Sequence, residues 1–475
     1  MAYRYGNRPQ TQLFPPSIEE YISEDDPVRV YDAFVDALDF TDLGLLLETN
    51  KVGCPQYDPG AMLKLFVYGY SYGVRSSRKL ERAVHHNLSF IWLMGGLKPD
   101  HKTIAEFRKN HKKVIVQVLK QCARLCMKLG LVEGNTLFVD GTKMRGNASI
   151  SRTWTEKRCE RYLKKVDARI ESILNECERI DAQEQTASSL VELQAELKTR
   201  TGLKARIERV QQELKQGNVK SINTTDSDCV KVKGRQGTHA GYNGQIVVDE
   251  KHGLIVQSDV VNKSNDVGQF ANQIELANEV LAKKCQNACG DAGYANTVEL
   301  KKIDDQGIAV IVPTFKQARG KPIKPFDKSQ FRYDSDNDQY QCPKEKILTY
   351  SHDCNIKRHR VYQIIDSRLC QVCEHFGKCT TSKSGRRIRR LEYEETKLKL
   401  EEQYQTDESQ DIYKLRKERV EHPFGHIKRN LGAGAFLLKG LDGVRAEMAL
   451  LSSCFNLARM ITLIGAQKLV AALAD

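Results

Sequence analysis

The sequence lacks the features of an exported or membrane-spanning protein. Its first residues, MAYRYGNRPQTQLFPP, contain no apolar stretch that resembles a signal peptide. Nowhere do about 18 apolar residues follow one another, the length that a membrane-spanning helix needs. We therefore expect a soluble protein that remains in the cytoplasm.

The sequence also lacks the two paired CxxC knuckles that would make a zinc module certain. Fourteen cysteines are present. Several stand singly within apolar helical patterns, where cysteine behaves as a small hydrophobic residue: Cys122, Cys126, Cys177 and Cys454. This usage predicts a reducing compartment rather than a disulfide-bonded secreted protein.

The charge is far from balanced. Lysine and arginine total 74 against 61 acidic residues, which gives a net charge of +13, and the pI is about 9.0. Such an excess favours a polyanionic partner, because Lys and Arg gain affinity by releasing counterions from phosphates. Net charge alone does not distinguish a nucleic-acid-binding protein from one with a solvated basic surface. The length of 475 residues predicts two or three domains.

Residues 18–131 carry apolar side chains at three- and four-residue steps, which predicts helices. The last of them, IAEFRKNHKKVIVQVLKQCARLCMKLGLV, is expected to be one helix that starts with a capping box of Thr103 and Glu106. A short helix, a turn at LKPD and this basic helix resemble a helix-turn-helix DNA reader. Its candidate DNA-binding residues are Lys102, Arg108, Lys109, Lys112 and Lys113. The alternative is a helical bundle with a solvated basic face.

The segment NTLFVDGT predicts a short buried strand that ends at Asp140 and Gly141. Apolar residues then keep heptad spacing from Leu163 to Ile180, and a second apolar series runs from Leu203 to Leu214. These two series predict an antiparallel helical hairpin that is inserted into the sheet domain.

Strand patterns resume after this insertion. GYNGQIVVDE and LIVQSDVV predict a β-hairpin, and VGQFANQIELANEVLAKK predicts a helix. A short strand in QNACGDAGYAN then ends at Asp291, and GIAVIVP predicts a buried strand. The result is a mixed sheet with Asp140 and Asp291 at strand ends, where open α/β sheets place ligands. Each aspartate taken alone is more typical of a turn.

Asp266, in SNDVGQF, has two interpretations. It is either a further active-site acid or the N-cap of the following helix. Its place before an apolar helix favours the cap.

Residues 314–400 form a second expected insertion. It contains five cysteines: Cys342, Cys354, Cys370, Cys373 and Cys379. Four thiolates, from Cys342, Cys370, Cys373 and Cys379, would suit a tetrahedral Zn²⁺ that stabilises a module too small for its own core. The alternative is a set of reduced surface thiols.

The late segment DIYKLRKERVEHPFGHIKRN surrounds Glu421 with positive charge. Either Glu421 balances its basic neighbours, or it holds a metal ion on a polyanion that they bind. Pro423 predicts a kinked helix or a new helix that begins beside it. Only a continuous helix returns Lys428, seven residues on, to the face of Glu421.

Taken together, these segments resemble the DDE transposases of bacterial insertion sequences, whose catalytic domain has a ribonuclease-H-like fold. FVDGTKMRGNAS resembles the first-Asp motif, GDAGYAN the second, and YKLRKERVEHPFGHIKRNLG the signature around the third acid. GYNGQIVVDE with SNDVGQF resembles the intervening sheet region. The N-terminal helices are similar to the amino-terminal domain of these transposases, and some longer members also have a cysteine insertion.

The resemblance implies the roles of individual residues. Asp140, Asp291 and Glu421 would bind two Mg²⁺ or Mn²⁺ ions, whose preference for oxygen ligands suits carboxylates. Tyr413, Arg416 and Lys428 would be accessory residues that contact DNA phosphate. Arg416 lies five positions before Glu421, where the commonest signature has four. Lys417 and Arg419 therefore remain alternatives for its role.

The resemblance also implies the domain order, in an α/β fold with a ribonuclease-H-like mixed sheet. We expect a helical DNA-binding domain (1–131), the first core strand (132–151), the helical hairpin (152–217), the catalytic core (218–313), the cysteine-rich insertion (314–400) and the end of the core with Glu421 (401–475).

The implied function is a transposase that binds terminal inverted repeats in double-stranded DNA, then cuts and joins strands. Two DNA ends must be held together, which predicts a homodimer, with the helical hairpin and C-terminal helices as candidate contacts. Three alternatives remain: a nuclease of the same fold that does not join, a domesticated DNA-binding protein without catalysis, and a zinc-dependent regulator.

Overall fold

The computed structural model describes residues 17–474 except 46–55, 183–186, 218, 235–236, 321, 323 and 355–358. The N-terminal segment in which no signal peptide is predicted lies outside this range, as does the side chain of Ile180. The chain divides into two compact units. Unit 1 holds residues 1–266, 275–284 and 417–475, and unit 2 holds residues 267–274 and 285–416.

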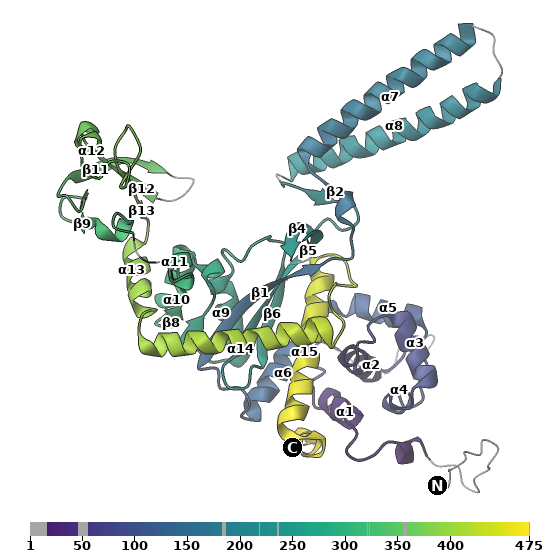
Figure 1. Ribbon diagram of the computed structural model, residues 1–475. Helices are drawn as coiled ribbons and strands as arrows, with labels where there is room; N and C mark the ends of the chain where they lie inside the picture. The colour runs from purple at the N-terminus through teal and green to yellow at the C-terminus, as the bar shows by residue number, and fades with distance from the viewer. Residues whose placement is uncertain are drawn as a thin grey trace, which may run out of the picture. The chain divides into compact units, whose positions relative to one another are not determined.

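Unit 1 begins with a group of helices that pack on one another (Figure 1). They are η1 (Ile18–Tyr21), α1 (Val28–Asp36), α2 (Pro59–Ser71), α3 (Ser77–His86), α4 (Leu88–Leu93), α5 (His101–Asn110) and α6 (Lys112–Lys128).

The predicted capping box and the single long helix after it are both wrong. Helix α5 starts earlier, because Asp100 is its N-cap and accepts a hydrogen bond from the Thr103 amide at 2.7 Å. The helix also ends at Asn110. His111, at φ −106° and ψ 30°, leaves the helical conformation and separates α5 from α6.

The sheet of unit 1 is antiparallel. Strand β5 pairs with β1 along one edge and with β4 and β6 along the other. The bounds are β1 (Thr136–Arg145), β4 (Val230–Gly234), β5 (Gly237–Asp249) and β6 (Ile255–Val261). The sequence patterns did not predict β4, although Val230 and Val232 alternate with lysines before a glycine-bounded turn.

Asp140 is not at a strand end, contrary to prediction. β1 continues for five residues beyond it and stays paired with β5 as far as Arg145. Gly141 lies within the strand rather than in a turn. A Cβ atom there would come within 2.4 Å of Asp266 Oδ1 and 2.5 Å of Gln245 Nε2, so packing, not backbone conformation, requires glycine.

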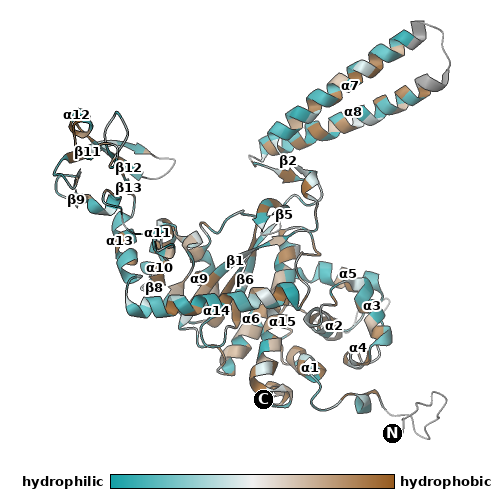
Figure 2. Cartoon of the chain, in the orientation of Figure 1, coloured by the Kyte–Doolittle hydropathy of each residue, from teal (hydrophilic) through white to brown (hydrophobic). Residues whose placement is uncertain are grey.

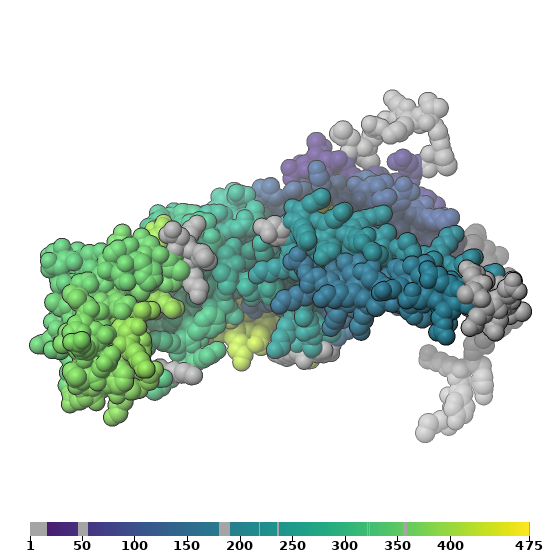
Figure 3. All heavy atoms as spheres, turned by 90° about the horizontal axis from the view of Figure 1, so that it is seen from above, coloured from purple at the N-terminus to yellow at the C-terminus, as the bar shows by residue number. Residues whose placement is uncertain are grey.

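Helices α7 (Glu156–Ala182) and α8 (Ala187–Gln216) lie side by side in unit 1 (Figures 1 and 3). Most of their residues are hydrophilic, with apolar residues between (Figure 2). A small core fills their base: Cys159, Val166, Ile207, Val210 and Leu214. The short strands β2 (Thr153–Trp154) and β3 (Ile222–Asn223) pair where the hairpin joins the chain, next to η2 (Ile150–Arg152).

Helix α15 (Leu441–Ile464) is a core helix of unit 1, and α16 (Ala466–Ala474) follows it. α15 packs against α2, α6 and β6, and most of its residues are buried. By length and composition it could cross a membrane, but 67% of its apolar window is buried inside the protein. The proposal that the C-terminal helices offer a dimer surface is therefore wrong for α15.

Unit 2 contains a parallel pair of strands, β7 (Asn287–Cys289) and β8 (Ala309–Ile311). Helices accompany them: the first turn of α9 (Phe270–Leu281), η3 (Ala292–Tyr294), α10 (Thr297–Asp304), α11 (Phe315–Ala318), α13 (Glu394–Gln403) and the first part of α14 (Asp407–Arg429). Parallel and antiparallel pairing both occur among the described strands, so the chain is of the α/β class with mixed pairing.

The cysteine-rich segment of unit 2 forms a five-stranded antiparallel sheet of order β13-β12-β11-β10-β9. The bounds are β9 (Arg332–Asp334), β10 (Gln339–Gln341), β11 (Ile347–Cys354), β12 (His359–Ile364) and β13 (Arg387–Leu391), with η4 (Lys328–Gln330) and α12 (Arg368–Gln371) beside them. Six buried residues form its core: Phe331, Tyr340, Leu348, Tyr362, Ile364 and Ile388. The expectation of a module without its own core is wrong.

Candidate active site

Asp140 lies on the face of β1 that also carries Thr142. Side chains alternate along a strand, so Asp140 and Thr142 share one face while Gly141 and Lys143 share the other. Asp140 is half-buried, and its Oδ1 accepts a hydrogen bond from the Gly141 amide at 2.9 Å. Its carboxylate therefore stands within the sheet rather than in a mobile turn.

Two contacts fix α14 beside β1 in unit 1. Arg419 Nε donates to the Glu250 carbonyl at 2.7 Å, and the Glu250 amide donates to the Thr136 carbonyl at 3.2 Å. Nine residues later, Lys428 Nζ donates to Thr142 Oγ1. Glu421 lies between the two anchors on the helix, and Asp140 lies between them on the strand.

Glu421 is exposed beside the buried face of α14, which Val420, Phe424 and Ile427 form. Lys428 follows Glu421 by seven residues, which returns it to within about 20° of the same helix side. Among the described residues, the Glu421 carboxylate has no ion pair and no side-chain hydrogen bond. The interpretation of Glu421 as a salt-bridged surface acid is therefore not what the structure shows.

Pro423 lies inside α14 and does not begin a new helix. Its ring is buried, and the helix runs on for six residues to Arg429. Of the two alternatives that the sequence left open, the continuous helix is correct, and Glu421 and Lys428 share one side of it.

Asp266 is not a helix cap, because α9 starts only at Phe270. Its carboxylate pairs with Lys143 Nζ at 3.0 Å and accepts hydrogen bonds from Asn243 (2.8 Å) and Gln245 (2.9 Å). These three donors reach it on the Lys143 face of β1, opposite Asp140. Asp266 therefore anchors a polar network under Gly141 and does not join Asp140 as a ligand.

In unit 2, Asp291 lies two residues beyond β7 and accepts a hydrogen bond from the Gly293 amide at 2.8 Å. It thus follows a strand, as predicted, and also caps the turn of η3. Arg416 Nη2 lies 4.0 Å from Asp291 Oδ2, and the Arg416 guanidinium lies 5.6 Å from the Tyr413 ring. Tyr413 is packed edge-on to Tyr404 at 5.2 Å.

These contacts distinguish Arg416 from the alternatives for its role. Arg419 is engaged with the Glu250 carbonyl and pairs with Glu418 at 2.9 Å. Lys417 is exposed. Of the three, Arg416 is the one that the structure places beside an acid of the predicted site. Thr142, the acceptor for Lys428, lies in the first-Asp motif, but the sequence gave no signal that distinguished it.

Among the described residues, no three His, Cys, Asp or Glu side chains are arranged as a metal site. The cysteines of unit 2 nevertheless gather: Cys342, Cys370, Cys373 and Cys379 line one cavity of about 40 Å³, and Cys354 lies elsewhere. The amides of Lys344 and Lys346 point at Cys342 Sγ (3.4 and 3.3 Å), which suits a thiolate. Burial raises the pKa of the Cys379 thiol above its ordinary value; Arg386 lowers this pKa, and the three neighbouring cysteines raise it.

The basic residues predicted to bind DNA differ in their surroundings. Lys102, Lys109 and Lys113 are exposed, and Lys112 is partly so. Arg108 differs from the predicted exposed cation, because its Nη1 donates inward to the Tyr70 hydroxyl (2.8 Å) and the Arg75 carbonyl (3.1 Å). Nη1 of Arg108 therefore connects α5 to Tyr70 and Arg75 inside the protein.

Two protein-family models match the chain. Residues 16–110 match the model described as "Transposase domain (DUF772)", and residues 341–461 match the one described as "Transposase DDE domain". The second match includes Glu421 and Lys428, whereas Asp140 and Asp291 lie outside both. No curated protein and no solved structure gives a significant match.

Proposed function

The two matches support the assignment of this chain to the insertion-sequence DDE transposases, and from that premise we propose that it cuts and joins DNA at the ends of its element. The observation that carries the proposal is the pair of anchors that holds α14 along β1. Glu421, which has no ion pair in the described part of the chain, shares one side of this helix with Lys428, and Lys428 contacts the strand of Asp140.

In this proposal Asp140, Asp291 and Glu421 hold the metal ions. When bound, two Mg²⁺ or Mn²⁺ ions would activate the attacking oxygen and stabilise the leaving oxygen of an in-line displacement at phosphorus. The donor set fits, because all three residues offer hard carboxylate oxygens. Water is the nucleophile for cleavage, and a terminal 3′-hydroxyl is the nucleophile for joining.

The accessory residues bind and orient the DNA backbone. Lys428 is held at Thr142, two residues from Asp140 on the same strand face, so its ammonium group is positioned for a phosphate beside that carboxylate. In unit 2, Arg416 and Tyr413 do the same beside Asp291, where Arg416 offers a planar set of donors. A fixed cation needs no reorganisation when charge develops on phosphate.

The N-terminal helices bind the terminal inverted repeats, with Lys102, Lys109, Lys112 and Lys113 as the available cations. The chain acts as a homodimer. The helical hairpin and α16 are the remaining candidate contacts, because α15 is buried in the core of unit 1. It works in the cytoplasm of a prokaryote, on the nucleoid.

We also propose that Cys342, Cys370, Cys373 and Cys379 bind a structural Zn²⁺. The chemistry of the donors supports this: four thiols share one small cavity, and backbone amides already point at the sulfur of Cys342. Thiolate ligands in a set of four are typical of structural zinc.

The test is cleavage of a labelled duplex that carries the element's own end, with Mg²⁺ or Mn²⁺, by wild type and Glu421→Gln. This substitution keeps the shape of the side chain and removes its charge. We expect wild type to cut and the variant to bind DNA without cutting. If both bind and neither cuts under conditions in which another transposase is active, the non-catalytic DNA-binding protein is the better description. Joining of pre-cut ends separates a transposase from a nuclease.

A further inference from the structure

A groove of about 840 Å³ opens in unit 1 at the base of the helical hairpin. One wall comes from the segment that enters α7 and from its first turns. The other walls come from the strands β3 and β4 and from the residues that follow β6. None of the site residues proposed above lines it.

The groove is strongly basic. Its cations are Arg158, Arg161, Lys220, Lys231 and Lys263, and its single acid is Asp228. Asp228 is already engaged, because its Oδ2 accepts the Leu441 amide at 2.7 Å. Arg161 and the three lysines are exposed, and none of them forms an ion pair within the part of the chain that the structure describes.

Arg158 and the base of the hairpin are held by several contacts. Arg158 donates to the carbonyls of Ser151 and Thr153, both at 2.8 Å, and its guanidinium lies 4.7 Å from the Trp154 ring. Across the strand pair, the buried Asn223 donates to Thr153 Oγ1 at 2.9 Å. The entry and exit of the hairpin are thus locked together, which fixes the position of the groove walls.

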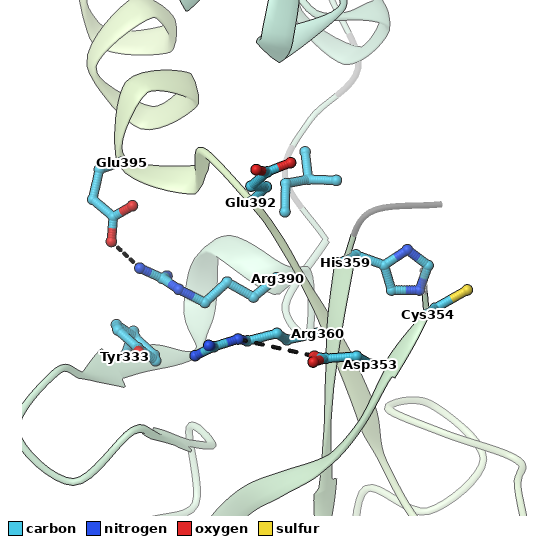
Figure 4. Close-up of a pocket in the computed structure, with 9 residues that line it drawn as sticks. Tyr333, Asp353, Cys354, His359, Arg360, Arg390, Glu392 and Glu395 are labelled. Carbon is cyan, nitrogen blue, oxygen red and sulfur yellow. Dashed lines mark hydrogen bonds and ion pairs between the residues drawn. The ribbon is translucent and has the colours of Figure 1, made fainter. Parts of the chain in front are cut away.

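A pocket of similar size in unit 2 contains both basic and acidic side chains, whose charges offset each other (Figure 4). It measures about 740 Å³ and also contains arginines. There, however, Arg390 is paired with Glu395, and Arg360 lies 3.9 Å from Asp353. Its positive charge is neutralised internally, whereas that of the groove in unit 1 faces solvent.

The groove is connected to the strand of Asp140. Lys263 lies two residues beyond Val261, which pairs with Asn243 on β5, and Asn243 pairs in turn with Lys143 on β1. Lys143 is three residues from Asp140, or about 10 Å along the strand. The groove residues that follow β6 therefore lie two strands away from the part of β1 that follows Asp140.

We propose that this groove binds the phosphate backbone of duplex DNA on the flank of the strand that is cut. The inference rests on the proposed function and deepens it. Lysines with hydroxyl groups between them, from Thr155, Ser221 and Ser227, are the chemistry that contacts phosphate rather than base edges. The groove therefore holds DNA without regard to sequence, so element ends and target DNA are held alike.

The test compares two triple variants with equal loss of charge. Lys220→Gln, Lys231→Gln and Lys263→Gln change the groove. Lys157→Gln, Lys164→Gln and Lys165→Gln change exposed lysines of α7 that do not line it. Affinity is measured by fluorescence anisotropy in EDTA, between low and moderate salt, on a duplex with the element's end and on an unrelated duplex.

We expect the groove variant to bind both duplexes at least about tenfold more weakly than the control variant. Its plot of log K against log salt should be shallower by about 2 to 3, because each phosphate contact contributes roughly 0.9 to the slope. Equal affinities and slopes for the two variants would overturn the inference. Weaker binding of the element's end alone would overturn its sequence independence.

Cutting is assayed separately with Mg²⁺, so the two proposals fail differently. If wild type cuts and the two triple variants bind equally, the groove proposal is wrong and the proposed function stands. If the groove variant loses affinity and wild type does not cut, the groove proposal stands and the enzymatic function is wrong.

Discussion

Arg75 and Glu447 form a buried ion pair within unit 1, with 3.2 Å between Arg75 Nη2 and Glu447 Oε1. The two side chains are 7% and 0% exposed. Arg75 also donates to the carbonyls of Gly432 (3.2 Å) and Ala435 (2.7 Å), in the segment that directly follows α14. The pair therefore ties the N-terminal helices to the core helix α15 and to the end of the helix that carries Glu421.

Removal of Arg75 should destabilise unit 1 strongly. Arg75→Met leaves Glu447 buried without its partner, which typically costs about 3 to 5 kcal/mol. Urea unfolding followed by circular dichroism measures the change. Lys414→Met, which breaks a pair with Asp411 whose side chains are both 73% exposed, is the control and should cost far less, because solvent screens an exposed pair. Similar costs for the two variants would contradict the central role of the buried pair.

Gly141→Ala should destabilise the protein by about 1 to 3 kcal/mol, the usual cost of overpacking. The added Cβ would meet Asp266 and Gln245, and Asp266 has little freedom to move because three side chains hold it. Gly202→Ala, in α8, is the matched control, since no atom lies within 4 Å of its Cβ position. It should be neutral or stabilising by up to about 1 kcal/mol. Thermal unfolding of both variants compares them directly.

Lys428→Gln should slow DNA cutting about 100-fold, the scale on which removal of one positioned donor acts. Thr142→Val keeps the cation and removes only its acceptor, so its effect should be smaller. Single-turnover cleavage rates at saturating DNA separate this step from binding. If Thr142→Val slows cutting as much as Lys428→Gln does, the ammonium group matters only as a structural anchor.

Zinc content should depend on particular cysteines. The double variant Cys370→Ser and Cys373→Ser should lose bound zinc, and Cys354→Ser should retain it, because Cys354 lies outside the cavity of the other four. Elemental analysis of protein purified without chelators gives the metal content. Absence of zinc from wild type after reconstitution would favour the interpretation of reduced thiols.

Stability should fall as the pH drops below about 6.5. Burial lowers the pKa of His422 and of His426 from the ordinary value of 6.5, Arg459 lowers that of His422 further, and His422 lowers that of His426. Both rings also pack against Phe455 (5.4 and 5.5 Å). A depressed pKa means that the unfolded chain binds more protons, so the stabilisation is present above 6.5 and is lost as pH falls through the folded values.

The double variant His422→Gln and His426→Gln tests this assignment. Its unfolding free energy should depend less on pH between 7 and 5 than that of wild type. An unchanged slope would assign the acid sensitivity to other groups.

The sequence by itself determined the local elements. Apolar spacing indicates helices: α7 lies where the heptad series starts at Leu163, and α8 contains the second apolar series, which starts at Leu203. Alternation and apolar runs indicate strands, and β5 pairs with β6 where two such runs flank a short turn. These patterns depend on neighbours a few residues apart, so they are visible without the fold. The motif around Glu421 led to the proposed site in the same way.

The tertiary structure decided what each polar residue does, because that depends on partners far along the chain. An Asp-Gly pair is typical of a turn, yet β1 continues through Gly141. Glycine is required there because Asp266 and Gln245 occupy the space that a side chain would need. The sequence favours Asp266 as a helix N-cap, whereas the fold brings Lys143 beside it as an ion-pair partner. Glu421 has basic neighbours in the sequence, yet it forms no ion pair among the described residues. The contacts of Arg419 with Glu250 and of Lys428 with Thr142 hold its helix beside the strand of Asp140.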